Sequence, residues 1–112
     1  MIGRAGHITK FNQKEVDQLF KKSHRIFYGT EFTVLAAPRE KEYARLLIIT
    51  PKNIGNAVRR HLLRRRLKHI FYQLKFFDRL KYDVVVIAKK PVTALDFQPL
   101  HDLFLKAVST IL

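Results

Sequence analysis

Cationic side chains are concentrated in the middle of the chain, and they carry its clearest chemistry. Residues 43–77 include nine Lys or Arg and no Asp or Glu, and six of the nine are arginines. Arginine offers a planar fork of N–H donors that matches a phosphate group. A helix face that is exposed only to water usually carries both positive and negative side chains, because like charges four residues apart destabilise a helix. The segment therefore indicates a surface that binds an anionic polymer.

One predicted helix displays most of these cations. Its apolar side chains recur at intervals of three and four residues, the spacing of a buried helix face, and they are Leu63, Leu67, Ile70, Phe71 and Leu74. At about 100° per residue, an adjoining arc collects basic and imidazole side chains, namely Arg60, His61, Arg64, Arg65 and Lys68. Arg59 and Arg66 fall on the other flank of the apolar stripe. The spacing predicts a helix that packs along one side and binds phosphates along the next.

Other kinds of site find little support in the sequence. The five histidines form no pair at helical spacing beside an acid, and cysteine is absent, so we expect no metal site in the protein. Neither serine lies in a nucleophile motif, and the segment around Gly55 lacks the glycine spacing of a phosphate-binding loop. Binding to a membrane surface or to a peptide-binding partner would require the apolar face of the helix to be exposed. A small domain needs that face for its own core, so these two uses are disfavoured. We therefore expect no catalytic residue in the chain itself.

Length and composition favour a single small domain. The chain has 112 residues, a formal net charge of +13 and 47% hydrophobic residues, which is enough apolar surface for one core. The longest apolar runs fall far short of the roughly 20 residues that cross a membrane. We expect a soluble cytoplasmic protein with a single polyanion-binding domain over residues 1–112, in which residues 1–10 form a flexible basic arm.

The apolar pattern and its breakers predict the order helix, two or three strands, helix, strand, helix. The first helix follows Asn12, which forms a capping box with Glu15, and it ends near Ser23. Extended segments are expected at 26–28, 32–37, 43–50 and 82–88, a polar turn at 78–81, the long helix between Gly55 and Leu74, and a last helix capped by Asp96. This order favours an α+β sandwich.

Residues 52–68, written KNIGNAVRRHLLRRRLK, resemble the signature of the protein component of bacterial ribonuclease P. In that family a lysine pair precedes a Gly-Asn-Ala-Val segment that opens a helix, followed by Arg-Asn-Arg and further basic residues. The match covers 55–58 residue for residue, together with Arg60, Arg64, Arg65 and Lys68. Three positions depart from the signature, since Asn53, His61 and Leu62 replace its second lysine, its asparagine and its second arginine.

The resemblance extends over most of the chain and implies a fold and a function. It implies a two-layer sandwich of a mixed four-stranded sheet with three helices, in the order α-β-β-β-α-β-α, with a left-handed βαβ crossover. In that family an RNA subunit uses Mg²⁺ to remove the 5′ leader of precursor tRNA, and the protein assists. The implied partners are thus the catalytic RNA and the leader, with Mg²⁺ held mainly by the RNA and the protein itself monomeric.

The resemblance also assigns site residues. The basic helix and its approach would contact the catalytic RNA through Lys52, Asn56, Arg59, Arg60, His61, Arg64, Arg65 and Lys68. A cleft between the first helix and the sheet would hold the single-stranded leader through Phe20, Thr33, Leu35 and Arg45, while Val16 stands where an aromatic residue is common. Phe20 is equally compatible with core packing beside Leu19. From charge and fold class alone, a ribosomal or general RNA-binding protein and a DNA reader remain alternatives.

Overall fold

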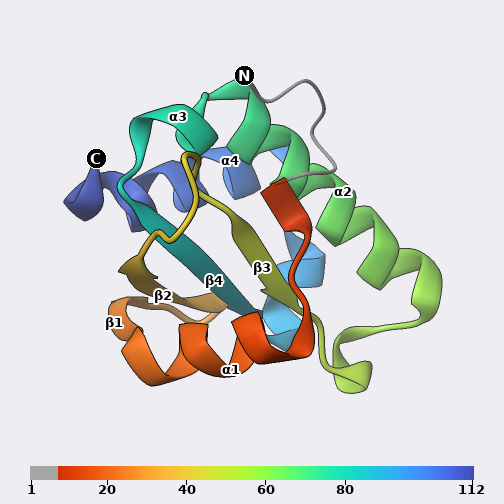
Figure 1. Ribbon diagram of the computed structural model, residues 1–112. Coiled ribbons are helices and arrows are strands. Elements are labelled where there is room, and N and C mark those ends of the chain that lie inside the picture. The colour runs from red at the N-terminus through yellow and green to blue at the C-terminus, as the bar shows by residue number, and fades with distance from the viewer. Residues whose placement is uncertain (1–7) are drawn as a thin grey trace.

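In the computed structural model, which describes residues 8–112, a four-stranded sheet carries helices on both faces (Figure 1). The helices are α1 (Gln13–Lys22), α2 (Ala57–Gln73), α3 (Phe76–Arg79) and α4 (Phe97–Val108). The strands are β1 (His24–Tyr28), β2 (Phe32–Pro38), β3 (Leu46–Ile49) and β4 (Tyr82–Ala88), and short 3₁₀ turns occupy η2 (Lys52–Ile54), η3 (Lys90–Ala94) and η4 (Ser109–Ile111). The predicted α+β class is confirmed.

The sheet is mixed, with the strand order β1-β2-β4-β3. β2 pairs antiparallel with both β1 and β4, whereas β3 and β4 run parallel. A parallel pair of strands needs a crossover connection, and here α2 and α3 supply it. β3 therefore forms one edge of the sheet, and α2 returns alongside it.

One face of the sheet packs against α2, α3 and α4 and forms the main core. Alternate residues of the central strands point to this side, among them Val34 and Val86, which are fully buried. Phe76 lies between Phe71 and Phe104 in edge-to-face contacts, with ring centroids 5.8 and 6.1 Å apart. These contacts join α2, α3 and α4 to one another over this face of the sheet.

The opposite face is covered only in part, by α1. Leu19 of α1 packs on Ala37 and Val85, and the surrounding sheet residues Leu35, Leu47, Ile49 and Ile87 are half-buried. Helices thus lie on both sides of the sheet, with α2, α3 and α4 on one face and α1 on the other. The partly open face beside α1 is where the leader cleft was expected.

The capping box predicted for α1 is confirmed, since Asn12 Oδ1 accepts from Glu15 N at 2.8 Å and Glu15 Oε1 accepts from Asn12 N at 3.0 Å. Asp96 does occupy the N-cap position of α4, but its side chain accepts no capping hydrogen bond. The helix α1 and the strands β1, β2 and β4 begin and end within two residues of their predicted positions.

The predicted flexible arm over residues 1–10 is wrong at its C-terminal end. Residues 1–7 lie outside the described residues, but Ile8 is fully buried in the main core and Lys10 O accepts a hydrogen bond from Arg45 Nη1. Residues 8–10, red in Figure 1, run between β3 and α2. Burial of the isoleucine side chain holds this segment in place.

Two further boundaries differ from prediction because of distant partners. β3 begins at Leu46 rather than residue 43, since Ala44 N donates to Phe77 O and Arg45 N donates to the Asp83 carboxylate. Residues 76–79 form α3 instead of a loop, because burial of Phe76 anchors a turn of helix after the left-handed residue Lys75.

Gly55 makes the sharp entry into α2 possible. Its φ of 154° and ψ of −175° lie in a backbone region that is essentially restricted to glycine. A Cβ at this position would also lie 3.1 Å from Arg59 Cδ. The backbone conformation at Gly55 therefore explains why a glycine occupies this position of the 52–68 motif.

We predict that Gly55→Ala lowers the free energy of unfolding by about 1–3 kcal/mol through this backbone strain. Urea denaturation followed by circular dichroism measures the change. Asn53→Ala, an exposed substitution two residues away, serves as the control. Equal unfolding midpoints for the two variants would contradict the assigned strain.

Candidate nucleic-acid interface

The N-terminus of α2 is fixed by a side-chain cap that we had assigned to RNA. Asn56 Oδ1 accepts from Arg59 N at 2.9 Å, and Asn56 O accepts from Arg60 N at 3.1 Å. An asparagine in this position satisfies backbone donors that the first helical turn leaves unpaired. Asn56 Oδ1 therefore helps to start the helix. The side chain is also exposed, so its predicted contact with RNA stays a prediction beside this capping role.

A groove lies between α2 and the edge strand β3. Its volume is about 450 Å³. Four of the predicted RNA-binding residues line one wall, in the order His61, Arg64, Arg65 and Lys68, and Thr9 with residues 46–48 of β3 completes it. Four of the five residues in the helical arc derived from the sequence thus share one groove, and Arg60 is not among its lining residues. The opposite wall comes from a strand that charge patterning could not identify.

Backbone groups of β3 also face this groove. Val84 N donates to Arg45 O across the parallel β3–β4 pair. Because alternate residues of a parallel strand bond to one neighbour, the N–H and C=O groups of Leu46 and Ile48 point toward the free edge. Leu46 is only 1% exposed, so Ile48, which is half-buried, is the residue whose backbone donor and acceptor face the row of cationic side chains.

The cations of α2 have no acidic partners among residues 8–112, where every ion pair involves other residues. Arg64 is held in place by donating to the Thr50 hydroxyl at the end of β3. Arg64 and Arg65 are both exposed. Uncompensated guanidinium groups with little competing hydrogen bonding are well suited to phosphates.

The other predicted members of the basic surface lie around the groove rather than in it. Lys52 is exposed in η2, and Arg60 is half-buried on α2. Arg59 faces a second pocket on the opposite flank of α2. Four of the eight predicted residues thus line the groove, and Asn56 caps α2. Arg59 lines the second pocket, while Lys52 and Arg60 line neither.

The predicted leader cleft is supported in part by the exposure of its residues. Phe20 is 39% exposed, which rules out the core packing that the sequence left open for it. Leu35 is half-buried on the sheet face that α1 shares, and Thr33 of the same face is only 8% exposed. An exposed aromatic ring beside a partly open apolar sheet face is suited to stacking with bases.

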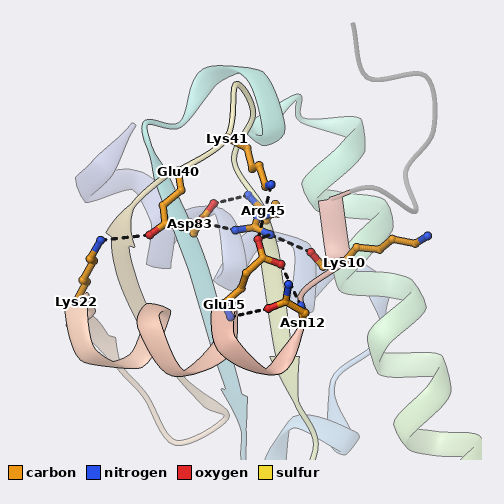
Figure 2. A network of polar contacts seen from close by, with 8 residues as sticks. All are labelled: Lys10, Asn12, Glu15, Lys22, Glu40, Lys41, Arg45 and Asp83. Carbon is orange, nitrogen blue, oxygen red and sulfur yellow. Dashed lines mark hydrogen bonds and ion pairs between the residues drawn. The ribbon is translucent and has the colours of Figure 1, made fainter.

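Arg45 does not belong to the cleft surface, contrary to prediction. Its side chain is 3% exposed, and its guanidinium pairs with Glu15 Oε2 at 2.8 Å and with Asp83 Oδ2 at 3.7 Å (Figure 2). It also lies over the Phe11 ring, 4.2 Å from the centroid. The cation joins α1 to β4 and to the residue that precedes β3. Its Nε has no hydrogen-bond partner among the described residues, but this atom is buried, so Arg45 presents no donor to a phosphate at the surface.

This network gives its two carboxylates different properties. The pKa of Glu15 is lowered, first by the hydrogen bond from the Asn12 backbone and then by Arg45. Burial raises the pKa of Asp83, although the hydrogen bond from Arg45 N and the charge of Arg45 oppose this effect.

Only about 10 Å³ of space remains between α1 and the sheet beside these two carboxylates, so the cleft is closed at this end.

No group of three or more His, Cys, Asp or Glu side chains that could hold a metal ion occurs within residues 8–112. Among the same residues, no helix is long and apolar enough to cross a membrane.

Comparison with known proteins gives a consistent result. A family model described as Ribonuclease P matches residues 11–112. The ribonuclease P protein component of Petrotoga mobilis is 28% identical over 86% of this chain and 84% of its own. That of Streptococcus pyogenes is 33% identical over 80% of this chain and 73% of its own.

Solved structures of the same description share the fold. The Thermotoga maritima RNase P protein superposes with a TM-score of 0.79 at 25% identity, covering 93% of this chain and 97% of its own. The Staphylococcus aureus RNase P protein has a TM-score of 0.80 at 22% identity, covering 92% and 94% of the two chains.

We predict that Arg45→Met lowers the free energy of unfolding by about 3 kcal/mol at pH 7, because Asp83 is left as an unpaired buried charge. The raised pKa of Asp83 sets the direction of the pH dependence. As pH falls through that pKa, Asp83 takes up a proton, and the deficit relative to the parent protein shrinks. Urea titrations between pH 7 and pH 4 measure it, and a deficit that grows toward pH 4 would contradict the assigned network.

Proposed function

This chain belongs to the ribonuclease P protein family, the protein subunit of an enzyme of tRNA processing, and from that premise we propose that it assists a catalytic RNA in removing the 5′ leader of precursor tRNA. The observation that carries the proposal is the groove between α2 and β3, with His61, Arg64, Arg65 and Lys68 along one wall. This groove would bind the backbone of the catalytic RNA. The protein contributes binding and charge, and the RNA carries out hydrolysis.

Electrostatics explains why such a reaction benefits from a small cationic protein. A precursor tRNA and a catalytic RNA are both polyanions, and their close approach is opposed by repulsion and by condensed counterions. Cations without acidic partners would neutralise phosphates at the junction and release those counterions. The net charge of +13 serves the same purpose over a longer range.

The partly open sheet face beside α1 would hold the leader. Phe20 is exposed there and Leu35 lies half-buried on the adjoining strand, so unpaired bases would find an apolar floor and a ring to stack on. Stacking on an aromatic side chain contributes about 1–3 kcal/mol per base and depends little on sequence. The proposed specificity is thus for single strands rather than for a particular leader.

Magnesium would be held by RNA rather than by this chain. Glu15 and Asp83, two carboxylates between α1 and the sheet, are both paired with Arg45. Phosphate oxygens of an RNA are hard ligands of the kind that Mg²⁺ prefers. In this proposal the protein acts on the metal indirectly, by letting the RNA fold and bind substrate at lower magnesium concentrations.

We predict that the protein restores 5′ processing of a precursor tRNA by a bacterial ribonuclease P RNA at low magnesium, and that the protein alone does not cleave. The double change Arg64→Ala and Arg65→Ala should weaken binding to that RNA and lower the slope of log K against log salt by about 2, one for each lost phosphate contact. Filter binding from 50 to 200 mM salt measures the slope.

The matched control removes the same charge elsewhere, through Lys81→Ala and Lys106→Ala, two exposed lysines outside α2. A control that lowers the slope as much as the arginine pair would show that only net charge matters. Failure to restore processing would instead favour a general RNA-binding protein.

Leader recognition gives a separate prediction. Phe20→Ala should weaken binding of a precursor tRNA with a single-stranded leader about 5- to 100-fold, as loss of one stacked base implies. Binding of the matching tRNA without a leader should be unchanged. Fluorescence anisotropy with the reconstituted complex measures both, and equal losses for the two RNAs would contradict the cleft.

A further inference from the structure

We propose that a second pocket, on the flank of α2 away from the groove, binds one unstacked nucleobase of an RNA strand whose phosphates are held by Arg59 and Arg66. The proposal adds a base site to the phosphate-binding surface and rests on RNA being the ligand. The pocket lies between α2 on one side and η3 with the start of α4 on the other, and its volume is about 260 Å³.

The pocket has an apolar floor made of core side chains. Leu63, Val92 and Leu100 are each 6% exposed or less and form its base. Leu62, Thr93 and Leu95 line the walls. Sites for drug-sized ligands usually measure about 300–1,000 Å³, so this volume suits a single flat ring system.

Leu62 explains why this surface is apolar at all. It is 37% exposed on a helix that is otherwise rich in cations, and it stands where the ribonuclease P signature has its second arginine. A leucine here exchanges one phosphate contact for apolar area that a base can cover. The departure from the signature thus coincides with the wall of a pocket.

Two guanidinium groups line the pocket from α2. Arg59 is exposed, and its side chain lies over Gly55, which directs its stem along the turn. Arg66 is half-buried, and its Nη1 donates to Leu95 O at the long distance of 3.5 Å. No acidic residue lines the pocket. The arrangement therefore complements a ligand that joins an apolar ring to anionic groups.

Neighbouring rings extend the surface by one helical turn. The Phe97 ring lies 6.1 Å from the His69 ring and 6.3 Å from the His101 ring, and Phe97 is 36% exposed. A strand that places one base in the pocket would find these rings available for stacking of a neighbour. The hydroxyl oxygen of Thr93, which donates to Lys90 O, keeps lone pairs that can accept from a base N–H. Rings beside arginines favour RNA over an acidic peptide.

The test compares three probes by methyl NMR of the full chain, namely adenosine 5′-monophosphate, ribose 5-phosphate and a blocked Glu-Leu-Glu-Leu peptide. The nucleotide should shift the methyl signals of Leu62, Val92 and Leu95 saturably and bind at least fivefold more tightly than ribose 5-phosphate. Leu62→Ala should abolish that preference. Val58→Ala removes another exposed apolar residue of α2 from outside the pocket and should keep it.

Three results would overturn the proposal. These are equal affinities of the nucleotide and ribose 5-phosphate, an unchanged preference in Leu62→Ala, or tighter binding of the peptide at the same methyl groups. The processing assay uses no mononucleotide, so the two proposals fail separately. If the protein restores tRNA processing but does not prefer the nucleotide over ribose 5-phosphate, only the base site is refuted. If it prefers the nucleotide but does not restore processing, only the proposed function is refuted.

Discussion

The parallel pairing of β3 with β4 is the constraint on which the arrangement of this protein depends. Parallel neighbours cannot be joined by a tight turn, so the chain must leave the sheet and return, and the crossover supplies the longest helix. Burial of Leu67, Ile70 and Phe71 fixes this helix against the sheet. The cationic face of α2 is thereby held alongside the unpaired edge of β3. A flexible basic tail, by contrast, would lose conformational entropy when its ligand ordered it.

Positive charge in this molecule serves two different purposes, and only burial distinguishes them. On α2 three arginines, Arg59, Arg64 and Arg65, are exposed, and within residues 8–112 the cations of this helix have no acidic partner. This condition destabilises the isolated protein slightly and favours association with a polyanion. Arg45 is chemically the same group, but it is enclosed by two carboxylates and an aromatic ring. It organises the sheet and α1, and its charge is neutralised inside the protein.

Local rules predicted the parts of the structure that depend on neighbours in sequence. The Asn12–Glu15 cap, the apolar stripe of α2 and the basic arc beside it are set by spacings of three or four residues, and all three were found. Arg45, Ile8 and the start of β3 were misjudged because their partners lie 30 or more residues away or in a core that no local pattern reveals. The capping role of Asn56 was not predicted, although an asparagine just before a helix is a local signal for it. Family membership confirmed the prediction of a ribonuclease P subunit, while catalysis by RNA and the individual contacts with RNA remain predictions.

The network around Arg45 also limits how this sequence can diverge. Glu15 is at once the cap partner of Asn12 and the counter-ion of Arg45, and Arg45 in turn satisfies Asp83 through both its backbone and its side chain. A substitution at any one of these positions leaves a buried charge or a free helix end at another, which selects against single changes. In related chains the four positions should therefore be retained or replaced as a set, although none of them needs to contact a substrate.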